Sequence, residues 1–133
     1  TQALVHNKRP TMINHIEVTT VFVKDQDDAI AFYRDVLGMQ VKIDTMMGEH
    51  FRWIEVMPEG AQTSIALLAP FNDEPIGVNT GMIFDTADVK AVYESWKDKV
   101  DFVQVPETQP WGGVQARFAD PDGNVFSIAQ KTA

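Results

Sequence analysis

The chain has 133 residues, the usual length of one domain, and 44% of them are hydrophobic against 23% charged. These fractions exclude an intrinsically disordered chain, and no apolar run approaches the roughly 20 residues that cross a bilayer. Cysteine is absent, which excludes disulfides, zinc–thiolate sites and thiol catalysis. No signal-peptide pattern is present either, so we expect a cytoplasmic protein with no membrane partner.

Acidic side chains outnumber basic ones by 19 to 11, and the net charge is −8 at pH 7. A surface of this sign repels phosphate backbones, which argues against a nucleic-acid partner. The same charge would attract a cationic ligand, although maintaining solubility is a sufficient reason for it.

The first half of the chain predicts a strand, a helix and three further strands. A β-branched run at 16–23 precedes a helix at 27–37, whose first turn can be capped by Asp25 or Asp27 and whose end is set by Gly38. The apolar side chains of this helix form one stripe, which indicates that one side packs on a sheet. The next strands are expected at 40–45, 51–57 and 63–68.

The second half predicts the same order of elements after a linker at 71–79. A strand at 81–85 leads into a helix at 87–99. The later strands are expected at 102–105, 114–119 and 125–129. The last two are joined by Asp-Pro-Asp-Gly-Asn at 120–124, in which proline presets φ and glycine can adopt the positive φ of a tight hairpin.

An internal repeat supports this division into two halves. Residues 25–33 resemble residues 85–93, with Asp, Asp, Ala and Tyr matching at an offset of 60 residues. We therefore expect one domain made of a first βαβββ module at 13–70 and a second at 80–133. Residues 1–12 show no periodicity and are expected to be a native N-terminal arm or a cloning remnant.

Three short motifs resemble those of a known family in both order and spacing. Asp-Gln-Asp at 25–27 precedes Phe32-Tyr33, Leu37-Gly38 ends the first helix, and the motif at 120–124 precedes the last strand. Together with the two halves, they make most of the chain resemble the vicinal oxygen chelate superfamily of glyoxalases, bleomycin resistance proteins and extradiol dioxygenases. The resemblance implies an α+β fold in which two βαβββ modules with curved mixed sheets form a cup.

The resemblance also implies where a metal would bind. Metal-dependent members hold a divalent ion in the cup through histidine and glutamate on the first and last strands of each module. The corresponding positions here are Val18, Gly81 and Ser127, with the fourth near Ser64 or Ala66. None offers an imidazole or a carboxylate, so we predict no metal and no other cofactor, although a divalent metal is the family cofactor.

The predicted cup is therefore a pocket for an organic ligand. Strand parity and loop position predict that it is lined by Val18, Thr20, Phe22, Arg52, Trp53, Gly81, Ile83, Trp111, Arg117 and Ser127. Trp111 either stacks on a planar ligand as a lid or anchors its loop on the sheet edge. Arg52 and Arg117 either pair with an anionic group or carry solvated cross-strand charge.

These observations predict a glyoxalase/bleomycin-resistance-like protein that binds a small organic molecule in the cup, without the usual metal. One alternative is a metal-dependent lyase, isomerase or dioxygenase of the same superfamily, with unrecognised ligands. Others are an antibiotic-sequestering resistance protein and a structural dimer without a ligand. No catalytic residue is assigned, and enzymatic activity is left open. Short chains of this superfamily often exchange halves across a twofold axis, so we also expect a homodimer.

Overall fold

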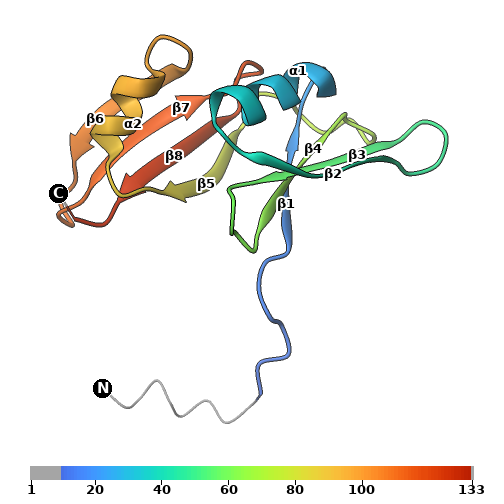
Figure 1. Ribbon diagram of the computed structural model, residues 1–133, viewed down its shortest axis with the longest axis horizontal. Coiled ribbons are helices and arrows are strands. Elements are labelled where there is room, and N and C mark those ends of the chain that lie inside the picture. Colours follow the sequence, from blue (N-terminus) through green and yellow to red (C-terminus); the bar gives the residue numbers. More distant parts are fainter. Residues whose placement is uncertain (1–9, 133) are drawn as a thin grey trace.

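The computed structural model describes residues 10–132, which fold into two four-stranded sheets side by side with both helices on one side of the molecule (Figure 1). The first sheet has the strand order β1-β4-β3-β2, in which β1 and β4 are parallel and the other pairs antiparallel. Its strands are β1 (Val18–Phe22), β2 (Gln40–Met46), β3 (Arg52–Met57) and β4 (Ser64–Leu68).

The second sheet repeats this topology as β5-β8-β7-β6, again with one parallel pair, β5 and β8. Its strands are β5 (Asn79–Asp85), β6 (Asp101–Thr108), β7 (Val114–Ala119) and β8 (Val125–Gln130). The α+β fold of two βαβββ modules is thus confirmed, and both sheets are open rather than closed.

Each module has a helix that begins where the sequence predicts. Helix α1 (Gln26–Ile30) is capped by the Asp25 side chain, which accepts from the backbone N–H of Asp28 at 2.9 Å. It continues as a π-helical segment, η2 (Ala31–Val36), before Gly38 reverses the chain with a φ of 82°. Helix α2 (Val89–Trp96) is capped in the same way by Asp88. The expected single helix at 27–37 is therefore two segments, and the helix expected at 87–99 is shorter.

The sides of the two sheets that face the helices form one shared hydrophobic core. Tyr33, Phe118 and Phe126 are fully buried there, and Phe118 and Phe126 stack with ring centroids 5.5 Å apart. The Tyr33 ring from the first module packs edge-on against Phe126 of the second, at 6.2 Å. The modules are thus joined through their helix-facing sides.

A buried polar group of residues also joins the modules, and we call Tyr33, Asp120 and Asn124 the junction. The Tyr33 hydroxyl donates to the Asp120 carboxylate at 2.7 Å, and burial, followed by this carboxylate, raises the pKa of Tyr33 far above its ordinary value. Asn124 donates to the same carboxylate at 3.0 Å and to the Phe22 carbonyl at 3.1 Å. The hairpin motif at 120–124 therefore connects the two modules as well as turning the chain.

Residues 10–17 precede β1 as an exposed segment without helix or strand, which extends away from the sheets (Figure 1). Met12 in this segment is 93% exposed and Ile13 is 76% exposed. The expectation of an N-terminal arm or remnant at 1–12 lies mostly outside the described residues. Within residues 10–132, no helix is long and apolar enough to cross a membrane.

Candidate ligand-binding faces

We call the side of each sheet that points away from the helices its outer face. On the first sheet, strand register places Val18 beside Ser64, Thr20 beside Ala66, and Phe22 beside Leu68. Val21 and Val23, at alternate positions, are buried in the shared core. Val18, Thr20 and Phe22 therefore lie on the outer face, as their strand parity predicts.

A buried carboxylate lies on this first outer face. Glu55 pairs with Ala66 across β3 and β4, and its side chain is 9% exposed. Its two oxygens accept from the Ser64 hydroxyl at 2.5 Å and from the Trp53 indole N–H at 2.7 Å. Lys42 lies 3.8 Å from the same carboxylate. The sequence analysis missed Glu55, although it shares its strand face with Trp53.

Four aromatic rings form a continuous row on the first module, and we call them the aromatic wall: Phe22, Phe71, Phe51 and Trp53. Neighbouring ring centroids lie 6.0 Å, 5.4 Å and 6.0 Å apart, all in tilted or edge-to-face contacts. Phe71, just after β4, is 63% exposed. Such a large exposed ring beside other aromatic rings points to a recognition surface.

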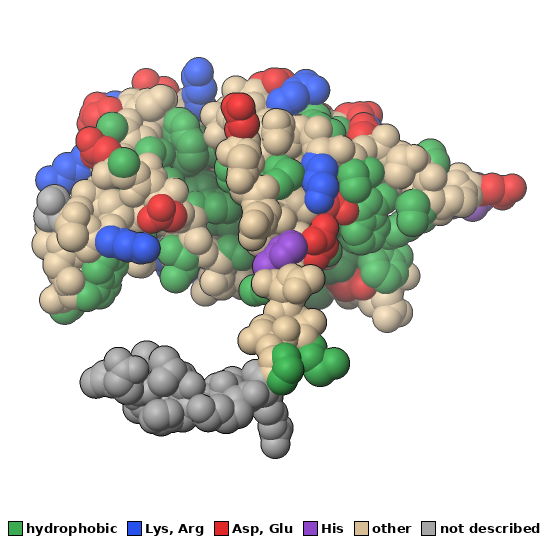
Figure 2. All heavy atoms as spheres, turned by 60° about the horizontal axis from the view of Figure 1, so that its bottom comes forward, with side chains coloured by type: hydrophobic (Ala, Val, Ile, Leu, Met, Phe, Trp, Pro, Cys, Tyr) green, Lys and Arg blue, Asp and Glu red, His purple; other side chains and the backbone are tan. Residues whose placement is uncertain are grey.

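The second outer face is lined by smaller side chains and one large exposed residue. Ser127 on β8 pairs with Ile83 on one side and Arg117 on the other. Ile83 is 67% exposed, and Gly81, two residues earlier, is also exposed. Arg117 and Ser127 are half-buried. The space-filling view shows hydrophobic side chains open to solvent on the face from which the N-terminal segment extends (Figure 2).

Trp111 borders a hollow of about 350 Å³ on the second module, together with Ile83, Gln115 and Ala129. Its ring lies directly over Gly113, where a Cβ would overlap the ring and the Gln130 carbonyl. The loop is thus anchored by this contact, while 54% of the Trp111 surface stays exposed beside the hollow.

Arg52 lies on the opposite side of its strand from Trp53. Its guanidinium forms ion pairs of 2.8 Å with Asp44 and with Asp27 at the start of α1. These hydrogen bonds raise the pKa of Arg52 and lower that of Asp44. The prediction that Arg52 lines the pocket does not match this position, because adjacent strand residues point to opposite faces.

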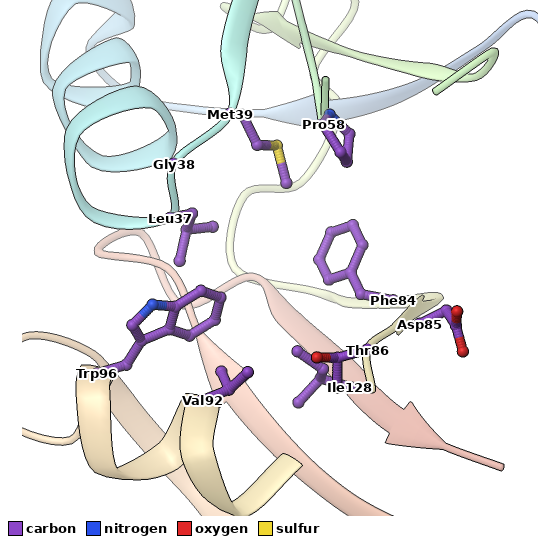
Figure 3. Close-up of a pocket in the computed structure, with 10 residues that line it drawn as sticks. All are labelled: Leu37, Gly38, Met39, Pro58, Phe84, Asp85, Thr86, Val92, Trp96 and Ile128. Atoms are coloured by element: carbon purple, nitrogen blue, oxygen red, sulfur yellow. The ribbon is translucent and has the colours of Figure 1, made fainter. Parts of the chain in front are cut away.

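A larger hollow, of about 380 Å³, lies between the modules on their helix-facing side (Figure 3). It is lined mainly by apolar side chains from both modules: Leu37, Met39, Pro58, Phe84, Val92, Trp96 and Ile128. It contains none of the predicted ligand-lining residues, whereas the hollow beside Trp111 contains two of them.

The positions that correspond to the family metal ligands carry no imidazole or carboxylate. Register places Val18 beside Ser64. Ser127 on β8 pairs with Ile83 on β5, two residues after Gly81. Aliphatic and hydroxyl side chains are poor ligands for divalent transition metals, which prefer imidazole and carboxylate donors. Among residues 10–132, no group of three or more histidine or acidic side chains is arranged to hold an ion.

In a single chain, the predicted ligand-lining residues therefore divide between two separate surfaces. Four of them lie on the first module's outer face and its aromatic wall: Val18, Thr20, Phe22 and Trp53. The other group lies on the second module: Gly81, Ile83, Trp111, Arg117 and Ser127. Phe51, Phe71 and Glu55 were not predicted to line the site.

Comparison with known proteins gives consistent matches. The family model of the Glyoxalase/Bleomycin resistance protein/Dioxygenase superfamily matches residues 12–128. A crystal structure of a member of this superfamily from Sphaerobacter thermophilus is 35% identical, with a TM-score of 0.86 over 90% of this chain and 99% of that one. TnmS3, an antibiotic binding protein from Streptomyces sp. CB03234, is 36% identical, with a TM-score of 0.80 over 91% and 98%. The uncharacterised protein YetH of Bacillus subtilis is 31% identical over 121 residues, 90% of this chain and all of YetH.

Proposed function

Because the chain belongs to the glyoxalase/bleomycin resistance protein/dioxygenase superfamily, we propose that it binds a small organic molecule between outer faces of its modules, without a metal ion. The observation that carries this proposal is the exposure of large apolar side chains on those faces. Ile83, Trp111 and Phe71 are each more than half exposed. Large apolar side chains exposed on sheet faces are typical of a binding surface, and here each module carries at least one.

The antibiotic-binding relative supports a finer form of the proposal. TnmS3 matches nearly the whole chain at 36% identity, so its ligand class is a reasonable guide to the ligand of this protein. We therefore infer that the ligand resembles an antibiotic and is sequestered rather than converted. The net charge of −8 favours neutral or cationic molecules over anionic ones.

A second copy of the chain would complete the cup. The sheets of one chain join through their helix-facing sides, and Phe71 on the first module and Ile83 and Trp111 on the second stay exposed. A twofold dimer would place the outer face of the first module of one copy opposite that of the second module of the other. Light scattering at micromolar concentration is expected to give twice the mass of the chain, and the monomer mass would contradict the dimer.

The metal-free part of the proposal rests on the donor set, because Val18, Gly81, Ser64 and Ser127 offer no imidazole or carboxylate. Protein purified and dialysed without chelator is expected to carry well under one equivalent of nickel, zinc, iron or manganese. One equivalent retained would instead favour the metal-dependent lyase, isomerase or dioxygenase.

A ligand screen tests the central claim. A panel of neutral and cationic polycyclic antibiotics is added to the full chain, and a rise in melting temperature identifies binders. Mass spectrometry of the ligand recovered after incubation is expected to show it unchanged. A new product would indicate an enzyme, and a panel without any binder would contradict the proposed function.

A further inference from the structure

The geometry points to Glu55 as a positioning residue that holds the Trp53 indole in the aromatic wall, so that the wall recognises flat aromatic ring systems. This inference rests on the proposed function and specifies the chemistry of its ligand. It assigns a role to the one carboxylate that is buried on an outer face of the described residues.

The hydrogen bonds of Glu55 are directed within the protein. One oxygen accepts from Ser64 on the neighbouring strand β4, and the other accepts from the Trp53 indole, two residues away on the same strand. Lys42 from β2 lies 3.8 Å away and balances the charge. Both carboxylate oxygens are therefore in use before any ligand arrives.

A buried carboxylate needs such partners, because an unpaired one strongly destabilises the folded state. At this position an apolar side chain would pack against Ala66 without that requirement. Glu55 therefore fixes the orientation of Trp53, because the N–H of this half-buried indole donates to it. The arrangement thus determines the orientation of one ring.

That ring is one end of the aromatic wall. The Phe51 ring centroid is 6.0 Å from that of Trp53, and Phe71 extends the row with a 5.4 Å contact to Phe51. Stacking on such rings contributes to affinity beyond the burial of apolar area. A fixed row of rings favours a flat aromatic ligand over an aliphatic one of similar size, because only a flat ligand can stack.

A direct role of Glu55 in binding a cationic ligand agrees less well with the structure. The side chain is only 9% exposed, and Trp53 and Ser64 already donate to its two oxygens. The two roles make opposite predictions for glutamine at this position. Its carbonyl oxygen can accept from Trp53, and its amide can donate to Ser64, whose hydroxyl hydrogen can turn to the Glu17 carbonyl 3.4 Å away.

The test uses the neutral planar dye quinizarin as the probe, titrated into the full chain with binding followed by tryptophan quenching. Glu55→Met is expected to weaken binding by roughly tenfold, whereas Glu55→Gln is expected to stay within about twofold of wild type. Glu49→Gln, in the exposed turn between β2 and β3, is the matched control. Phe71→Leu changes an exposed ring, so it tests the wall even if Glu55→Met fails to fold.

Four outcomes would overturn the inference. If Glu55→Gln loses as much affinity as Glu55→Met, the charge of Glu55 acts on the ligand and the positioning role is wrong. If Phe71→Leu binds like wild type, or if wild type binds adamantane-1-carboxamide as tightly as quinizarin, the aromatic wall does not select flat rings and the proposed function still stands. If wild type binds neither quinizarin nor any antibiotic of the panel, the proposed function fails as well.

Discussion

At the junction of the two modules Asp120 and Asn124 are almost fully buried, whereas on the outer faces Ile83, Phe71 and Trp111 are more than half exposed. The junction is polar and its groups are hydrogen-bonded to one another. The outer faces are apolar at their most exposed points. Both regions thus reverse the usual distribution, in which polar side chains lie outside and large apolar ones inside.

The difference separates the residues that hold the fold from those available for function. The junction groups satisfy one another, so they stabilise the arrangement of the modules and leave little to offer a ligand. Removing the exposed apolar side chains lowers stability very little. Their surface contributes free energy only when a ligand or another protein chain covers it. Substitutions at the two regions should therefore give opposite phenotypes.

The largest effect is expected at the junction, from Asp120→Ala. This change leaves the Tyr33 hydroxyl and the N–H groups of Asn124 without their acceptor in a buried environment. We expect the free energy of unfolding in urea to fall by about 3–5 kcal/mol. Asp122→Ala is the matched control and should change it by less than about 1 kcal/mol, because that carboxylate accepts from an exposed backbone N–H of Lys24. Equal effects would show that the junction has no special role.

The next largest effect compares two tryptophans. Trp96 on α2 packs edge-on against Phe118 in the core, with ring centroids 5.5 Å apart, so Trp96→Ala should lower the free energy of unfolding by about 3 kcal/mol. Trp111→Ala should lower it by less than about 1 kcal/mol but weaken ligand binding roughly tenfold. Melting curves and titrations on both variants check this. Normal binding with early melting of Trp111→Ala would make Trp111 a loop anchor only.

A smaller effect depends on pH and involves Tyr33. Burial and Asp120 raise the pKa of Tyr33 above its ordinary value. The folded state thus disfavours the phenolate. The contribution of the Tyr33 hydroxyl to stability is complete below about pH 10 and is lost as the pH rises further. Tyr33→Phe should lower the free energy of unfolding by about 1–2 kcal/mol at neutral pH. Above about pH 10, the difference between wild type and variant should shrink by up to about 1.4 kcal/mol per pH unit. Urea denaturation at increasing pH measures it, and a constant difference would contradict the assignment.

The smallest effect on stability is expected on the second outer face. Ile83→Asn replaces a side chain that is 67% exposed, so the free energy of unfolding should change by less than about 0.5 kcal/mol. Ligand binding should nevertheless weaken severalfold, since apolar surface is lost from the proposed site. A clear loss of stability without a loss of binding would place Ile83 in a structural contact instead.

Local signals in the sequence predicted most of the fold. The Asp25 cap, the Gly38 stop and the strand at 114–119 all follow from short-range preferences that the folded chain retains. The π-helical segment after Ile30 did not follow from them, because the apolar stripe of an α-helix and that of this segment are alike over six residues.

Side-chain partners across the fold were much harder to predict. The contact of Tyr33 with Asp120 joins residues 87 positions apart, and no local pattern in one sequence indicates it. Strict strand parity, in contrast, would have separated Arg52 from Trp53 and added Glu55 to the candidate residues. Strand parity in the sequence is therefore enough to assign site residues to a face of each sheet. It does not reveal the side-chain contacts between distant residues that complete a site.

The junction also has a consequence for the order of folding. Its hydrogen bonds join residues 87 and 102 positions apart, whereas the strands of the first module pair within residues 18–68. Contacts at long sequence separation form late, because closing a long loop costs entropy before the contact contributes. We therefore expect the first module to order before residues 120–124 leave the ribosome, and the junction to form afterwards, when the second module packs against the first. Its stabilisation should then act on the unfolding rate, which determines how long the native state persists, and leave the folding rate nearly unchanged.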